Sequence, residues 1–113
     1  QYDTVLIGWA ADSPDPDNFF RPLLSCAAVI TGSNRANWCD DHFDNLINQA
    51  LLTDDQQKRH GYYIAAQQYL AAQIPLVSIA HSQRFQALNS RISGAEINPY
   101  GGIRLAQVKK GTP

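Results

Sequence analysis

Asp12 and Trp9 are the residues of the opening segment whose types could bind a charged ligand. They follow the apolar and β-branched run Thr4–Ile7, which stops at Gly8, and a Pro/Asp-rich stretch comes after them. This order predicts a strand, a turn and then a helix. Such a strand presents Trp9 and Asp12 at its carboxyl end, where α/β proteins usually bind ligands. The alternative interpretation makes Asp12 a turn or capping residue and Trp9 an anchor in the core.

Cys26 and Cys39, the two cysteines of the chain, are the second group with chemical potential. They flank a predicted loop and are either a disulfide in an exported protein or two buried thiols in a cytosolic one. A metal site is poorly supported, because His42 is not followed by further ligands at zinc-like spacing. Cys39 and His42 also have the spacing of a thiol nucleophile and its base, oriented by Asp41 or Asp44. Against catalysis, no oxyanion-hole signature is visible.

Composition limits the remaining function classes. The 113 residues, 44% of them hydrophobic, fit one small domain. The net charge is −1 and basic residues do not alternate with aromatic ones, so we do not expect a nucleic-acid partner. No apolar stretch approaches the roughly 20 residues that span a bilayer. The chain starts at Gln1, contains no Met and lacks a signal-peptide pattern, and we interpret it as a mature product or an excised piece.

Two helices are the clearest elements in the middle of the chain. Apolar residues recur at helical spacing in the first one, which Asp40 or Asp41 would cap. Its apolar positions are Phe43, Leu46, Ile47, Ala50 and Leu51. The stretch Thr53–Gln56 is typical of a capping box that begins the second helix. Pro75 makes Ile74 the expected end of that helix.

Strands are fewer, and they lack neighbours. Leu76–His81 is a short apolar run and predicts a buried strand, whereas Ile103–Val108 alternates like an edge strand. Residues 85–97 are only weakly periodic, and we expect Lys109–Pro113 to be a disordered tail. Two or three strands make a poor sheet alone. The sequence therefore suggests a fragment of a larger protein.

Several short motifs occur in collinear order along nearly the whole chain. They are Gly8–Asp12, Asp15–Phe20, Leu24–Ala28, Gly32–Asn34, Asn37–Cys39, Phe43–Ile47, Thr53–Asp55, Lys58–Arg59, Tyr63, Ala66–Gln67 and Ile79–Ser82. In these motifs the chain resembles the C-terminal part of the periplasmic dipeptide/oligopeptide-binding proteins, which are solute-binding components of peptide ABC transporters. Within that family it looks nearest to the dipeptide-binding branch and to the Sap-type branch, which is linked to antimicrobial-peptide resistance.

The resemblance implies a fold and a setting. The fold class is α/β, as the C-terminal part of a two-lobed periplasmic-binding-protein-like (type II) fold, in a helix-rich fragment with few strands. Residues 1–82 would be the last part of the second lobe, and residues 83–113 a hinge and return segment toward the first lobe. The partners would be a short peptide, an inner-membrane ABC permease and the missing N-terminal portion of the same protein. Export to a Gram-negative periplasm follows.

The resemblance also implies a role for individual residues. The family's aspartate that pairs with the α-ammonium of the peptide falls on Asp12, in a Gly-Trp-x-x-Asp context. The ligand-binding residues would then be Gly8, Trp9, Ala10, Ala11 and Asp12. Cys26 and Cys39 would be disulfide-bonded, as in the dipeptide-binding branch. We expect no metal, no cofactor and no catalysis. Pro22 departs from the family's pattern in the helix after Asp12, and it would weaken that helix unless the helix is short or starts late.

Three alternatives stay open at this point. A protein of the same architecture can carry a non-peptide solute, such as haem or a metal chelate. Cys39 with His42 would instead make the chain a thiol enzyme. A small interaction module would also explain strands without neighbours, since a partner would then supply them.

Overall fold

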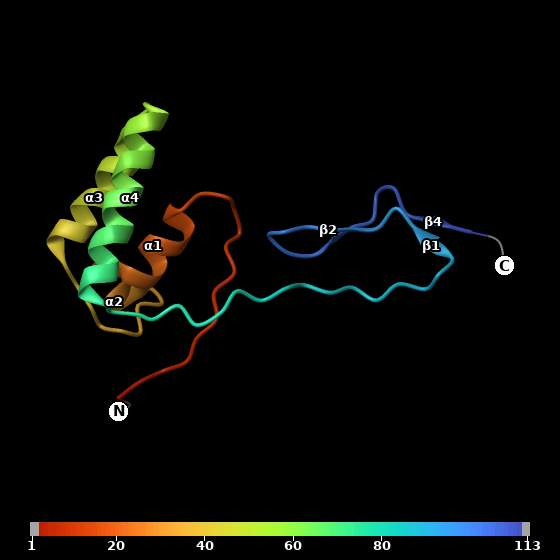
Figure 1. The fold of residues 1–113 in the computed structure, drawn as a ribbon, viewed down its shortest axis with the longest axis horizontal. Coiled ribbons are helices and arrows are strands. Elements are labelled where there is room, and N and C mark those ends of the chain that lie inside the picture. The colour runs from red at the N-terminus through yellow and green to blue at the C-terminus, as the bar shows by residue number, and fades with distance from the viewer. Residues whose placement is uncertain (1–2, 112–113) are drawn as a thin grey trace. The chain divides into compact units, whose positions relative to one another are not determined.

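The computed structural model describes residues 3–111, which form two compact units (Figure 1). The first, called the helical unit below, ends at Ser78, and the second, called the hairpin unit, begins at Ile79. Helices and short strands make up the regular structure, in agreement with the helix-rich fragment that the sequence predicts. None of the helices within residues 3–111 is long and apolar enough to cross a membrane.

Four helices build the helical unit. They are α1 (Asp17–Leu24), α2 (Ala27–Thr31), α3 (Asp41–Leu52) and α4 (Gln56–Gln73). The helices α3 and α4 lie side by side, and α1 packs against α2 and α3 (Figure 1). Since only a short turn joins α3 to α4, the two run in opposite directions.

The start of α3 and the end of α4 confirm the predictions from the sequence, whereas the start of α4 differs from its prediction. The Asp40 carboxylate accepts a hydrogen bond from the backbone N–H of Phe43 at 3.0 Å, so the first of the two candidate aspartates caps α3. The capping box predicted at Thr53–Gln56 is not formed, because Asp55 rather than Thr53 caps α4 and accepts from the N–H groups of Gln57 and Lys58. Ile74 ends α4 in the left-handed conformation with φ of 51°, and Pro75 then prevents its continuation.

The core of the helical unit comes from three of its helices. Its buried members are Phe20, Leu23, Leu24, Phe43, Ile47, Ala50, Tyr63 and Ala66. The ring of Phe20 meets Phe43 edge-on at a centroid distance of 5.8 Å and stacks on Tyr63 at 5.9 Å. Each such pair adds about 0.5–1.5 kcal/mol to the area it buries. These contacts fix α1 against α3 and α4.

Pro22 lies inside α1, which at eight residues is the short helix that a proline permits, and the helix buries Phe20 and Leu24 on either side of it. One local prediction in the first part of this unit needs correction. The segment between the two cysteines is not wholly a loop, since it contains the five-residue α2. The Ser25 hydroxyl accepts a bond from Ala28 N–H at 3.2 Å and starts that turn.

The strands predicted at residues 4–8 and at Leu76–His81 are wrong for the residues that the structure describes. Both segments are extended but form no ladder. Most of their apolar side chains are exposed, with Leu6 at 82% and Val77 at 72%, whereas Leu76 is half-buried against the core. A strand is defined by hydrogen bonds to a neighbour, and residues 3–111 provide none for these segments. The sequence pattern identified apolar segments correctly, but it could not show whether a neighbouring strand is present to pair with them.

The hairpin unit contains two pairs of short antiparallel strands. They are β1 (Ile92–Ser93) with β4 (Lys109–Lys110), and β2 (Glu96–Ile97) with β3 (Ile103–Arg104). The edge strand predicted at Ile103–Val108 is therefore reduced to its first two residues. Lys109 and Lys110 are paired rather than disordered, while residues 112–113 of that expected tail lie outside the described residues. The weakly periodic stretch 85–97 supplied β1 and β2, which its pattern did not indicate.

Candidate functional site

Asn18 holds the predicted ligand-contacting segment against α1 through two hydrogen bonds. Its backbone carbonyl accepts from the indole Nε1–H of Trp9 at 2.9 Å. Its side-chain Oδ1 accepts from the backbone N–H of Asp12 at 3.0 Å. Two residues that are three positions apart are thus attached to one residue in the first turn of the helix.

Asp15 provides a second attachment, to α4. Its carboxylate accepts from Arg59 Nη2 at 2.5 Å and from the Tyr63 hydroxyl at 3.3 Å. The same carboxylate accepts from Asp17 N–H at 3.0 Å, as a residue just before a helix often does. The Arg59 guanidinium also lies over the Tyr63 ring, 5.5 Å from its centroid. Asp12 therefore lies between two anchored points of the loop that leads into α1.

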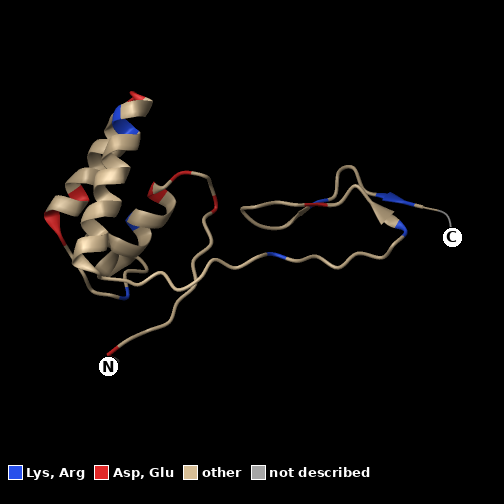
Figure 2. Ribbon diagram, viewed as in Figure 1, with Lys and Arg blue, Asp and Glu red and all other residues tan. Residues whose placement is uncertain are grey.

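The electrostatics of this second attachment favour the ionised carboxylate. The hydrogen bond from Asp17 N–H, and then those from Arg59 and Tyr63, hold the pKa of Asp15 below its ordinary value of 3.8. Burial and the nearby Asp15 charge raise the pKa of Tyr63. At neutral pH Asp15 is thus a carboxylate and Tyr63 a phenol that donates to it. Acidic residues lie in the loop before α1 and in its first turn, as Figure 2 shows.

The side chains of the predicted ligand-contacting segment face solvent. Asp12 is exposed, as are Gly8 and Ala10, whereas Ala11 is half-buried. Trp9 is 40% exposed even though its indole nitrogen is bonded to Asn18. In this segment the Trp9 indole and the Asp12 backbone are bonded to Asn18, and the Asp12 side chain is exposed. An interaction with a ligand stays a prediction for them.

Sequence reasoning missed the residues that hold this segment. In the sequence, Asn18 and Asp15 were visible only as members of the Asp15–Phe20 motif, without a role of their own. Arg59 and Tyr63 are 44 and 48 positions from Asp15, and no spacing rule relates residues so far apart. Pro22 was a possible signal for the role of Asn18, because a proline has no N–H to donate to the carbonyl four positions earlier.

Cys26 and Cys39 are joined in a disulfide, and the residues described include no free cysteine. The bond ties the start of α2 to the start of α3. Next to it, the Asp44 carboxylate accepts from Cys26 N–H at 3.2 and 3.3 Å. Burial raises the pKa of Asp44, and the Cys26 bond offsets part of that effect. A disulfide here is what the family resemblance implies.

The disulfide bears on both metal binding and thiol chemistry. Within the described residues, Cys26, Cys39 and Asp41 form a cluster of metal-ligand types, with ligand atoms within 4.8 Å of one another. Metal binding and nucleophilic attack both require a thiolate, and both sulfur atoms are used in the disulfide. His42 instead packs its ring edge-on against Tyr69 at 4.7 Å. The arrangement required for a Cys39–His42 enzyme is therefore not formed.

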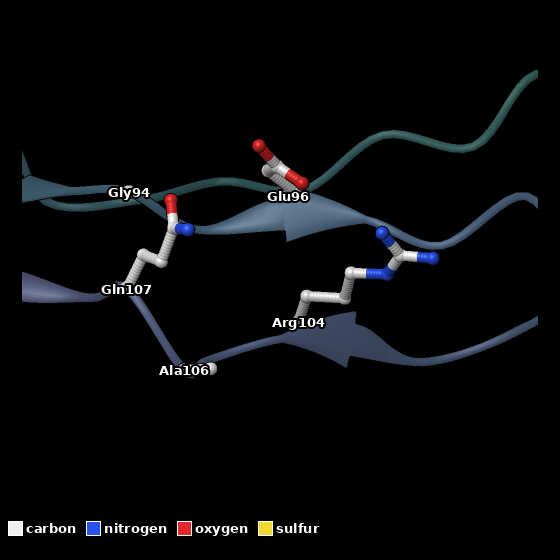
Figure 3. A pocket seen from close by; sticks show the side chains of 5 residues that line it. All are labelled: Gly94, Glu96, Arg104, Ala106 and Gln107. Carbon is white, nitrogen blue, oxygen red and sulfur yellow. The ribbon is translucent and has the colours of Figure 1, made fainter.

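The hairpin unit has a small hollow of about 120 Å³. Figure 3 shows its lining residues, which are Gly94, Glu96, Arg104, Ala106 and Gln107. Glu96 and Arg104 project from facing positions of β2 and β3. The volume is below the roughly 300 Å³ at which ligand pockets begin. None of the residues predicted to contact a ligand lines this hollow.

Comparison with known proteins identifies relatives of one kind, although no protein-family model matches the chain. The probable ABC transporter periplasmic-binding protein SapA of Escherichia coli K12 is 44% identical over 107 residues, which are 95% of this chain and 20% of that protein. The dipeptide-binding protein of the same organism is 43% identical over 101 residues, or 89% of this chain and 19% of that protein. The chain is homologous to periplasmic peptide-binding proteins.

A solved structure extends the relationship to the fold. The crystal structure of a dipeptide-binding protein from Pseudoalteromonas sp. SM9913, in complex with Met-Leu, is 52% identical and gives a TM-score of 0.78. The match covers 90% of this chain and 20% of that one. The chain thus spans about one fifth of the length of the relatives it matches. The family resemblance read from the sequence motifs is confirmed.

Proposed function

We propose that this chain is the C-terminal segment of an exported peptide-binding protein of an ABC transport system. The observation that carries the proposal is the match at 52% identity and a TM-score of 0.78 to a solved dipeptide-binding protein, over 90% of the chain. The full protein would capture short peptides in the periplasm and deliver them to a membrane permease. No chemistry is performed on the ligand.

In this proposal Asp12 pairs with the α-ammonium of the peptide. An ammonium enclosed by a closing protein must be paired, because an unpaired buried charge is costly. A carboxylate supplies both the countercharge and a charge-assisted hydrogen bond. Asp12 is exposed and its backbone is fixed by Asn18, so its side chain is free to meet a ligand. Trp9 and the Gly8–Ala11 backbone would border the same pocket.

The rest of the same protein is the partner that the exposed apolar segments require. In the opening segment, Val5, Leu6 and Ile7 are 47%, 82% and 49% exposed. Since neighbouring residues of an extended segment face opposite sides, apolar residues at all three positions indicate burial on both faces, as in the centre of a parallel sheet. We propose that residues 1–82 complete a sheet of the second lobe and that residues 83–113 form the hinge and return segment.

The disulfide supports the periplasmic setting. Disulfides persist in oxidising compartments such as the periplasm and are rare in the cytosol. Cell fractionation followed by mass spectrometry of the periplasmic extract tests the assignment. The full protein should appear in that extract with Cys26 and Cys39 unavailable to alkylation before reduction. Recovery in the cytosolic fraction alone would contradict the assignment.

Calorimetric titration of the full-length protein with Met-Leu and with its N-acetylated form tests the function. We expect saturable binding of Met-Leu and a loss of affinity of at least about 30-fold on acetylation, because truncating one partner of a buried charge pair costs several kcal/mol. Asp12→Asn should lose affinity for Met-Leu to a similar degree. Asp54→Asn, which changes an exposed aspartate before α4, is the matched control. A protein that binds neither peptide does not have the proposed function.

A further inference from the structure

We propose that Pro22 and Asn18 form a positioning device for the ligand-contacting segment. The inference rests on the proposed function and adds residues that do not touch the ligand. Pro22 leaves the Asn18 carbonyl without its helical partner, and Asn18 uses that carbonyl and its side chain to hold Trp9 and Asp12. The role of Pro22 in this proposal is to leave the Asn18 carbonyl available to Trp9.

The first step is the carbonyl of Asn18. In a regular α-helix this group would accept from the N–H of the residue four positions later, which is Pro22. Proline has no N–H, and its ring also presses on the carbonyl four positions earlier. The Asn18 carbonyl is therefore available, and the indole of Trp9 donates to it at 2.9 Å. The missing helical hydrogen bond at Pro22 thus leaves the Asn18 carbonyl as the acceptor for the Trp9 indole.

The second step is the side chain of Asn18. Its Oδ1 accepts from Asp12 N–H at 3.0 Å and so fixes the peptide plane from which the Asp12 side chain projects. An Ala at position 18 would keep the carbonyl and lose this bond. Trp9 and Asp12 are thus attached through different groups of one residue. The two bonds can be removed separately by substitution.

The third step is the rigidity of α1 itself. Phe20 and Leu24 are buried in the core. Arg21 pairs with Asp17 of the same helix at 2.9 Å and donates to Asn48 of α3 at 3.1 Å. A helix held by its buried side chains and by a hydrogen bond to α3 gives a fixed position to the residues bonded to its first turn. Asn18 can therefore serve as a reference point for Asp12.

The consequence for binding is preorganisation. A carboxylate held near its bound position before the peptide arrives saves the cost of ordering it during binding. The carboxylate itself stays free, because the bonds to Asn18 use the indole of Trp9 and the backbone of Asp12. Removing either bond should weaken peptide binding while leaving the core of the helical unit intact.

The test measures affinity for Met-Leu and the midpoint of thermal unfolding in the full-length protein. Pro22→Ala gives position 22 an N–H that competes with Trp9 for the Asn18 carbonyl. We expect the unfolding midpoint to stay or rise, because proline disfavours a helix interior, while affinity falls about fivefold, as for loss of one hydrogen bond. Opposite directions of the two readouts distinguish positioning from a structural role.

Asn18 is tested in parallel. Asn18→Ala should lower affinity about fivefold, and Asn18→Asp, which keeps an acceptor, should restore most of it. Asn45→Ala, at an exposed position of α3, is the matched control and should bind as the original protein does. Hydrogen exchange of the Asp12 amide without ligand reports the lost bond directly. In an Asp12→Asn background, Asn18→Ala should have little further effect on affinity.

The outcomes separate this proposal from the function on which it rests. If Asp12→Asn weakens binding but Pro22→Ala and Asn18→Ala do not, the positioning device is wrong and the proposed function stands. If Asp12→Asn binds as the original protein does, the role proposed for Asp12 is wrong as well. If a variant at position 18 does not fold, Pro22→Ala alone decides, and a fall in affinity together with a fall in the unfolding midpoint overturns the proposal.

Discussion

Arg59 and Asp15 form an ion pair across 44 positions of the chain, with Nη2 of the arginine 2.5 Å from Oδ2 of the aspartate. The pair joins α4 to the loop just before α1. Tyr63 lies beside both groups, donating to Asp15 and accepting from Arg59, each at 3.3 Å. The loop that carries Asp12 therefore has its far end attached to the longest helix of the unit.

Arg59→Ala should destabilise the helical unit by about 1 kcal/mol, because both charged groups are partly exposed and solvent screens their attraction. Denaturant unfolding of the full-length protein, with hydrogen exchange to assign the change to α1 and α4, measures it. Lys58→Ala removes an exposed cation one position earlier and serves as the control. Equal unfolding curves for the two variants would show that the ion pair contributes nothing.

The pH dependence of stability should have contributions of opposite sign from Asp15 and Asp44. Hydrogen bonds from Asp17 N–H, Arg59 and Tyr63 lower the pKa of Asp15 in the folded protein. Its stabilisation is then present above the ordinary value of 3.8 and is lost as the pH falls through the lowered pKa. Burial raises the pKa of Asp44. Protonation of Asp44 therefore favours the folded state as the pH falls from its raised pKa toward 3.8.

Two amide substitutions separate these contributions. Asp15→Asn should flatten the loss of stability below pH 3.8, whereas Asp44→Asn should remove the compensating gain just above it. Unfolding midpoints measured from pH 7 to pH 3 give both curves. Parallel curves for the two variants would contradict the opposite pKa directions.

The disulfide should stabilise the unit that contains it. Cys26 and Cys39 are separated by 13 positions, and closing a loop of that size contributes about 3 kcal/mol in the chain-entropy description. The double variant Cys26→Ala with Cys39→Ala should lose that amount in denaturant unfolding, although the backbone N–H at position 26 can still donate to Asp44. Intact mass before and after reduction and alkylation is the control. Alkylation without prior reduction would contradict the bond.

The sequence predicted those elements that depend on nearby residues and failed for those that depend on residues distant in the chain. The helices α3 and α4 were predicted because apolar periodicity and capping residues are local signals. Asp40 was among the predicted caps of α3, whereas the cap of α4 is Asp55 and not Thr53 of the predicted capping box. The predictions of strands at residues 4–8 and Leu76–His81 were wrong, because a strand requires a neighbouring strand and residues 3–111 provide none for these segments. Asn18 was missed because its role depends on a carbonyl that only the absence of an N–H on Pro22 makes available.

The candidate site also combines a local feature that the sequence revealed with long-range contacts that it did not. The motif around Asp12 was visible as a pattern of residue types. The attachments that hold it could not be read, since Arg59 meets Asp15 only after α4 has packed on α1. In the hairpin unit, β1 pairs with β4 in the register that places Ile92 opposite Lys110. Nothing in the weak periodicity of residues 85–97 indicated that pairing.

Gly94 in the hairpin unit should be intolerant of any side chain. Its φ is +76°, which L-residues rarely adopt, and an added Cβ would lie 2.1 Å from the backbone oxygen of Gln107. Gly94→Ala should therefore displace the chain after β3 and increase hydrogen exchange in β1 and β4. Gly102→Ala is a matched control, because its φ is +70° but nothing lies within 4 Å of the added Cβ. It should cost only the backbone strain of about 1 kcal/mol, and equal effects at the two positions would show that the approach of Gln107 does not matter.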